Sequence, residues 1–133
     1  MRKFLVLVMV LILSGCANKQ EELDLTGLSD TMAYSQLINI IKEPEDHLGD
    51  RIILEGIFSA PFNGFTHEYN YTVTIQDNTQ CCAQGIEFVL KKKGNFPEDF
   101  PEEGELIKVT GTLTLFEEGK HSYCIISDAD IIE

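Results

Sequence analysis

The residues of this chain with the most distinctive potential for chemistry are the adjacent cysteines Cys81 and Cys82. Neighbouring cysteines seldom bond each other, because the eight-membered ring strains the peptide between them, so each needs another partner. Cys124 and His121, well separated from the doublet in the sequence, offer the two side chains that most often ligate zinc. These four residues are therefore the candidates for a disulfide or a metal site.

Three interpretations of the four residues stay open. A disulfide from Cys124 to Cys81 or Cys82 would stabilise a small domain by about 2–4 kcal/mol and leave one thiol over. A zinc or copper site would combine two or three of the cysteines with His121, although the spacing is not that of a zinc finger. A reactive redox pair is the third, but acidic surroundings without a neighbouring Lys or Arg would keep the thiol pKa high.

Short strands must position these residues. Runs rich in β-branched and aromatic residues, each bounded by turn-forming residues, predict five strands over residues 51–59, 69–76, 85–90, 105–116 and 122–127. One helix is expected before them, with Asp30 as its N-cap and Lys42 as its last residue. Its apolar residues recur at helical spacing, and Pro44 ends the pattern.

The glycines within the predicted strands indicate strong bending. Gly56 lies inside the first strand and Gly111 inside the long fourth strand, where each permits a bend or kink. The expected fold class is therefore all-β, a small five-stranded OB-fold-like barrel preceded by one α-helix. A small β-sandwich is the alternative, because periodicity alone does not fix the order of strands.

The OB topology predicts where the cysteines meet. Its third and fifth strands are parallel neighbours, so residues at the start of both would lie at one end of the barrel. That end would hold Cys81, Cys82 and Cys124, with His121 in the preceding turn and Asp77 at the end of the second strand. We call the predicted combination of Cys81, Cys82, Cys124 and His121 the cysteine–histidine cluster.

The first sixteen residues predict an export signal. Arg2 and Lys3 precede an uninterrupted apolar run over residues 4–13, which is too short to cross a bilayer as a mature helix. The tetrapeptide LSGC that ends the segment resembles the lipobox of bacterial lipoproteins. That resemblance implies cleavage before Cys16 and acylation of its sulfur, for example with palmitate. An ordinary secretory signal with a chance cysteine is the alternative.

The expected organisation is a signal peptide over residues 1–15, a lipidated N-terminus and flexible tether over 16–29, and one OB-like domain over 30–133. Cleavage removes two of the ten basic residues, so eight remain against 22 acidic residues, a formal charge of −14. Such a surface repels phosphates and anionic lipid headgroups, which argues against nucleic acid as a partner. Contact with the membrane is therefore expected to come from the lipid on Cys16.

Three segments carry a further resemblance. They are the turn PEDHLG before the first strand, the doublet within CCAQGIEFV, and the run PEEGELIKVTGTL. Over residues 38–133 the chain resembles the C-terminal domain of an uncharacterised bacterial family encoded with a putative permease. The resemblance implies an OB-like domain near a membrane partner and supplies no reaction. The family usually has an acidic residue soon after the doublet, where this chain has Ala83 and Gln84.

The predicted function is that of a lipid-anchored lipoprotein on the extracytoplasmic face of the cell membrane. It would act as a non-enzymatic binding or accessory module, beside a permease or another membrane protein. The alternative is a metal-handling protein that binds zinc or copper through the cysteine–histidine cluster; no other cofactor is expected. Aromatic residues could line a ligand-binding face or serve as core and loop anchors: Phe58, Phe62, Phe65, Tyr69 and Tyr71.

Overall fold

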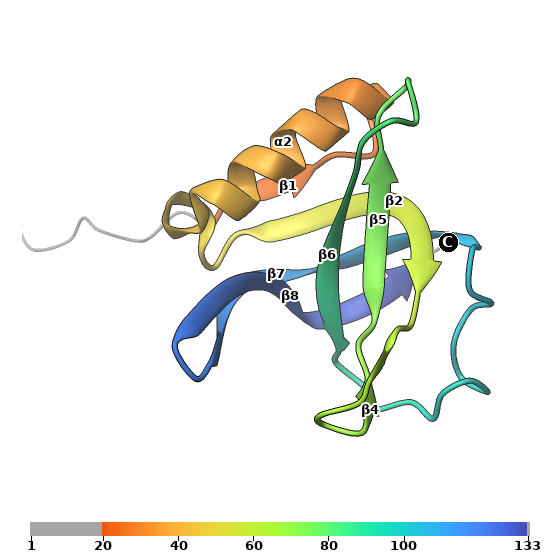
Figure 1. Cartoon of the computed structure of the whole chain (residues 1–133). Helices are drawn as coiled ribbons and strands as arrows, with labels where there is room; N and C mark the ends of the chain where they lie inside the picture. The colour runs from red at the N-terminus through yellow and green to blue at the C-terminus, as the bar shows by residue number, and fades with distance from the viewer. Residues whose placement is uncertain (1–19, 133) are drawn as a thin grey trace, which may run out of the picture.

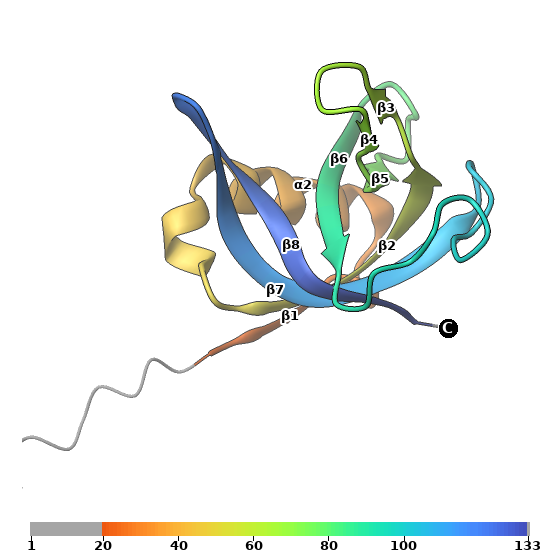
Figure 2. The ribbon, with the colours of Figure 1, turned by 90° about the horizontal axis from the view of Figure 1, so that it is seen from below.

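The computed structural model describes residues 20–132, which are mostly β-structure with one α-helix (Figure 1). Five strands follow one another around a single sheet in the order β2-β5-β6-β8-β7, and β7 pairs again with β2. The sheet is therefore ring-like, as Figure 2 shows, and the fold is a small β-barrel-like one. The strands of the ring are β2 (Arg51–Ser59), β5 (Thr72–Gln76), β6 (Ala83–Leu90), β7 (Leu106–Glu118) and β8 (His121–Ile132).

Alternating side chains of the strands fill the ring. In β2, the residues Ile52, Leu54 and Phe58 are fully buried, while their neighbours along the strand are more exposed. This is the period of two expected of a strand with one face turned inward. Leu113 of β7 and Ile126 of β8 are fully buried in the same core.

Two glycines allow the strands to approach closely. A Cβ atom on Gly56 would lie 2.5 Å from the carbonyl oxygen of Thr74 on β5. A Cβ atom on Gly111 would lie 2.5 Å from Cγ2 of Ile126, and the pairing of β7 with β8 shifts register at this point. Both positions therefore exclude any larger residue unless the backbone moves, and both are places where the sequence predicts a bend.

Helix α2 (Asp30–Lys42) ends at the predicted residue, begins one residue earlier than predicted, and packs against β5 and β6. Its N-cap is Ser29 rather than Asp30, because the Ser29 side chain accepts a hydrogen bond from the Met32 N–H at 3.4 Å. Asp30 is instead the first helical residue, where its negative charge complements the helix dipole. A 3-10 helix η2 (Pro44–His47) leads from α2 towards β2.

The predicted tether over residues 16–29 is wrong for the part that the structure describes. Strand β1 (Glu22–Asp24) pairs in parallel with the first residues of β2, and Leu25, at 6 % exposure, belongs to the core. Two backbone bonds fix the segment, from Arg51 N–H to Glu21 O at 2.9 Å and from Leu25 N–H to Ile53 O at 2.8 Å. The predicted signal peptide and Cys16 lie outside the described residues.

The other strand boundaries differ from expectation by one or two residues in β6 and β7 and by more in two places. The predicted second strand divides into β4 (Glu68–Tyr69) and β5, and β4 pairs with β3 (Phe62–Asn63) in a small hairpin between β2 and β5. Strand β8 continues to Ile132, beyond the predicted end at residue 127. Asp128 has a left-handed backbone (φ 47°) that interrupts the regular pattern without ending the strand.

Candidate functional site

The cysteine doublet lies in the tight turn between β5 and β6. The Asp77 N–H donates to the carbonyl oxygen of Cys82 at 3.1 Å, and the Gln80 N–H donates to that of Asp77 at 2.9 Å. Gln80 closes the turn with a left-handed backbone (φ 55°). In Figure 1 this turn lies beside the N-terminal end of α2, so the doublet is presented at one end of the barrel.

Two thiols and one carboxylate gather in this turn. The Sγ atoms of Cys81 and Cys82 are 3.3 Å apart, and the Cys81 thiol donates to Oδ2 of Asp77 at 3.9 Å. One ligand atom from each of the three residues lies within 4.8 Å of the others. Both cysteines are exposed and Asp77 is half-buried. We call Asp77, Cys81 and Cys82 the thiol cluster.

The surroundings of Cys82 favour the protonated form of its thiol. The hydrogen bond with Cys81, followed by the charge of Cys81, raises the pKa of Cys82. Tyr34 of α2 lies close by, and its pKa is raised first by burial and then by the charge of Cys82. A thiol without a nearby cation is a weak nucleophile at neutral pH, which argues against a reactive redox pair and agrees with the prediction of a high thiol pKa.

Cys124 and His121 do not join the thiol cluster, which corrects the predicted cysteine–histidine cluster. Strands β6 and β8 are parallel neighbours, as expected, but their pairing begins only where Glu87 meets Ile125. Before that point β8 pairs with β7 alone, with Cys124 opposite Leu115. The β7–β8 hairpin, which carries His121 at its tip, is accordingly well away from the β5–β6 turn in both ribbon views (Figure 1, Figure 2).

Cys124 is a core residue. Its side chain is 7 % exposed, and burial raises the pKa of its thiol to about 11. Cys81, Cys82 and Cys124 are all free thiols, so the predicted disulfide between Cys124 and the doublet is not present. Cys124 therefore acts as a small apolar side chain rather than as a ligand.

A groove of about 680 Å³ on another face of the barrel is the second candidate site. It lies over β6, between the β3–β4 hairpin, the loop that follows β6, and residues near the tip of the β7–β8 hairpin. We call it the aromatic groove, because six partly accessible rings line it: Tyr69, Tyr71, Phe96, Phe100, Phe116 and Tyr123.

The aromatic rings form a packed wall. The ring centroids of Tyr71 and Phe100 are 4.1 Å apart in a stacked arrangement, and those of Tyr69 and Phe96 are 4.4 Å apart. Phe58, at the centre of the core, stacks on both Tyr71 and Phe100. The wall of the groove is therefore continuous with the barrel core and is held in one arrangement.

This arrangement separates the aromatic residues that the sequence grouped together. Tyr69 and Tyr71 line the groove, whereas Phe58 is core. Phe62 packs its edge on Tyr69 outside the lining, and Phe65 at the hairpin tip is 99 % exposed. Phe96 and Phe100 were not predicted as lining residues; each is followed by a proline in the loop after β6, which was the available signal in the sequence.

The charge in the groove is negative. Glu68, Glu87 and Glu118 line it against one cation, Lys93. Burial, followed by the charge of Glu118, raises the pKa of the Glu87 carboxyl. Burial also raises the pKa of Tyr123, with Glu87 as the next cause. The groove thus offers aromatic faces and a partly desolvated carboxyl, which together suit a positively charged organic group.

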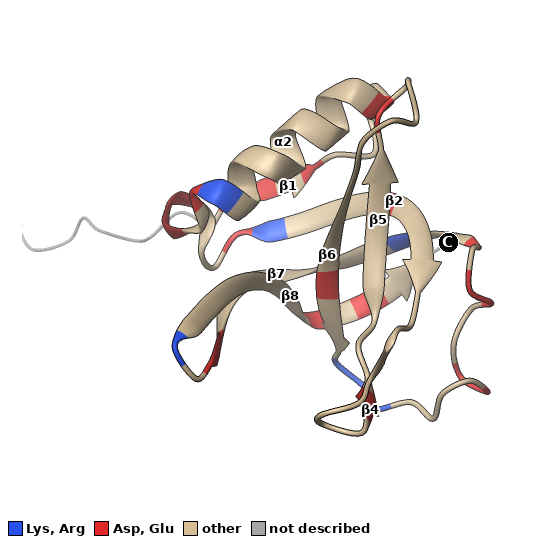
Figure 3. Ribbon diagram, viewed as in Figure 1, with Lys and Arg blue, Asp and Glu red and all other residues tan. Residues whose placement is uncertain are grey.

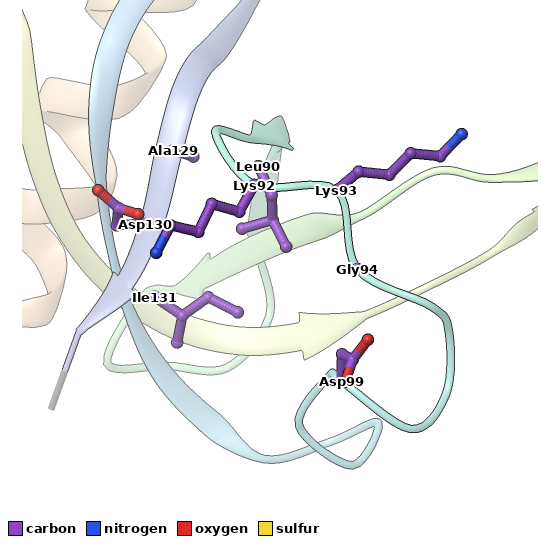
Figure 4. A pocket seen from close by; sticks show the side chains of 8 residues that line it. All are labelled: Leu90, Lys92, Lys93, Gly94, Asp99, Ala129, Asp130 and Ile131. Carbon is purple, nitrogen blue, oxygen red and sulfur yellow. The ribbon is translucent and has the colours of Figure 1, made fainter.

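A smaller hollow of about 290 Å³ lies behind the loop that follows β6 (Figure 4). Leu90 and Ile131 form its apolar sides, and Lys92 extends along it towards Asp130. Lys93 points away from the hollow in the same view. With opposite charges already facing each other, this hollow is a weaker candidate than the aromatic groove.

Acidic residues outnumber basic ones across the elements of the fold (Figure 3). Within residues 20–132, no helix is both long and apolar enough to cross a membrane. The chain matches no family model, no curated protein and no solved structure.

Proposed function

We propose that this protein is a lipid-anchored, extracytoplasmic binding module that holds a cationic organic ligand in the aromatic groove. The observation that most strongly supports this proposal is the groove itself, which has a volume of about 680 Å³ and walls of packed aromatic rings. A volume of several hundred cubic ångströms with apolar walls and a few polar groups is typical of sites for small molecules. Binding without chemical conversion is the simplest function for such a surface.

An OB-fold-like assignment supports the use of this face. Counted along the chain, β2, β5, β6, β7 and β8 are the first to fifth strands of the ring, and the third and fifth are parallel. OB-folds bind ligands on the face of strands two and three and with the loops after strands one and four. The corresponding elements here are β5 and β6, the β3–β4 hairpin and the β7–β8 hairpin, which are the elements around the groove.

The charge of the lining selects the class of ligand. Three carboxylates against one lysine leave the groove negative, so a phosphate-bearing ligand such as nucleic acid is disfavoured. A cation over a Tyr or Phe face gains about 0.5–2 kcal/mol, more when desolvated. An amine or quaternary ammonium on an apolar or aromatic body would meet both requirements.

The cellular setting of the proposal comes from the N-terminal sequence. The tetrapeptide LSGC and the apolar run before it support export, cleavage before Cys16 and attachment by lipid. A membrane protein such as a permease is the partner implied by the resemblance of residues 38–133. The binding module would then hold its ligand close to that partner.

Tyrosine fluorescence tests the proposal directly, because the chain has no tryptophan and three of its four tyrosines line the groove. We expect benzyltrimethylammonium to change the fluorescence of the full chain in detergent with saturation. Phenylmethanesulfonate, of opposite charge, should not do so. Glu87→Gln and Phe116→Ala should each weaken cation binding several-fold, whereas Phe65→Ala should leave it unchanged, because Phe65 lies outside the lining.

Two results would contradict this function. Equal binding of the anionic and cationic probes would show that the carboxylates do not select the ligand. Unchanged affinity in both Glu87→Gln and Phe116→Ala would show that the probe binds elsewhere.

A further inference from the structure

The distances between the ligand atoms of the thiol cluster suit a metal ion with tetrahedral coordination. Zinc–sulfur bonds of about 2.3 Å place neighbouring ligands of a tetrahedron roughly 3.8 Å apart. The two Sγ atoms are 3.3 Å apart, and Sγ of Cys81 is 3.9 Å from Oδ2 of Asp77, values on either side of this edge length. Small rotamer changes would therefore bring all three ligand atoms to one ion.

The donor set points to a thiophilic divalent cation. Thiolates favour zinc and other soft or borderline metals, whereas calcium and magnesium take sets of oxygen ligands. Two sulfur atoms and one carboxylate oxygen are all available to zinc. The Thr79 hydroxyl donates to the Asp77 carboxylate at 2.9 Å, so the oxygen ligand is already oriented by an outer partner.

The position of the cluster leaves the ion accessible. Cys81 and Cys82 are exposed in a turn, and Asp77 is the third group within ligand distance among residues 20–132. Three protein ligands leave a fourth position of the tetrahedron to water or to an incoming ligand. The ion would accordingly exchange with solvent, unlike a closed structural zinc.

We propose that Asp77, Cys81 and Cys82 form an exchangeable binding site for zinc or a similar thiophilic divalent cation. None of the three residues lines the aromatic groove, so this site is independent of the function proposed above. It also replaces the ligand set predicted from the sequence, because Asp77 takes the place of Cys124 and His121. The doublet thereby acquires partners that lie within one turn of the chain.

Cobalt is the probe for this site, because thiolate-to-cobalt charge transfer reports how many sulfur ligands are bound. We expect the full chain in detergent, reduced and treated with chelator, to bind one equivalent of Co²⁺ with this absorption and to release it to Zn²⁺. Cys81→Ser or Cys82→Ser should abolish the two-thiolate spectrum. Thr79→Val should weaken binding about tenfold, the lower limit for loss of an outer hydrogen-bond partner, and Asp77→Asn more strongly.

Matched variants separate this site from other cysteines. Cys16→Ser, Cys124→Ser and His121→Ala should each leave the cobalt spectrum and affinity unchanged, and circular dichroism should confirm that every variant is folded. A loss of binding in Cys124→Ser or His121→Ala would overturn the assignment. So would cobalt binding unaffected by Asp77→Asn, or a Cys81–Cys82 disulfide that persists under the reducing conditions of the titration.

Discussion

The cysteine side chains of the domain lie in two opposite environments, solvent for the doublet and the core for Cys124. Cys81 and Cys82 are exposed, whereas Cys124 is in the core with its pKa raised to about 11. We predict that iodoacetamide at pH 8 labels Cys81 and Cys82 of the native chain and leaves Cys124 unlabelled, because alkylation needs an accessible thiolate. Peptide mass spectrometry measures the three sites separately. Equal labelling of Cys124 without denaturant would contradict its burial.

Glu87 lines the aromatic groove, and its ionisation also affects the free energy of unfolding. Its folded-state pKa is raised by burial and by Glu118, so the folded protein binds more protons there than the unfolded chain does. The free energy of unfolding therefore falls as pH rises above the ordinary carboxyl value of 4.5. We predict that Glu87→Gln raises Tm at pH 7 and that the gain disappears as pH falls below 4.5.

Thermal unfolding followed by circular dichroism at several pH values checks this prediction. Glu45→Gln is the matched control, because Glu45 is an exposed glutamate of η2 outside the groove. A gain of the same size in Glu45→Gln would assign the effect to the overall negative charge. A Glu87→Gln variant with higher Tm and weaker cation binding would show a carboxylate kept for binding at the expense of stability.

Among the elements, β1 is one that the sequence did not predict. Leu25, which follows it, is 6 % exposed and packs into the core. We predict that Leu25→Ala lowers the free energy of unfolding by about 2–5 kcal/mol, the range for a buried leucine. Urea unfolding measures this loss. Leu48→Ala is the control at 42 % exposure and should cost much less; equal effects would place Leu25 outside the cooperative core.

Elements defined by local chemistry could be predicted from the sequence. The bounds of β2 agree with expectation and those of α2 agree to within one residue, because apolar periodicity and turn residues mark the ends of both elements. The β3–β4 hairpin has only two residues in each strand, too few for a period to show. In β1, the alternation of Glu22, Leu23, Asp24 and Leu25 is short and lies in an acidic stretch, so the composition of a tether concealed it.

The candidate sites were predictable only where their residues are near in the sequence. Asp77 and the doublet lie in one turn and come together as expected. The position of Cys124 depends on where two parallel strands begin to pair, which no local pattern specifies. The aromatic groove draws on the β3–β4 hairpin, β6, its following loop and the β7–β8 hairpin, so only the folded barrel assembles it.

At the scale of the whole molecule, the proposed attachment to the membrane depends on one residue, Cys16. The chain has 22 acidic against 10 basic side chains, so its surface is not attracted to anionic lipids. We predict that Cys16→Ser abolishes labelling by a radioactive or clickable fatty acid and moves the protein out of the membrane fraction. Cys124→Ser should leave both properties unchanged. Unaltered membrane partition of Cys16→Ser would contradict lipid anchoring.

If Cys16 carries the proposed lipid, the parallel pairing of β1 with β2 shortens the segment that would connect the membrane to the domain. The ordered fold begins by Glu22, six residues after Cys16, and a chain of that length spans at most about 20 Å. A tether as far as Asp30 would span about 45 Å, so the volume within reach of a lipid on Cys16 shrinks roughly tenfold. The domain would thus meet a neighbouring membrane protein at a correspondingly higher effective concentration, without any new contact.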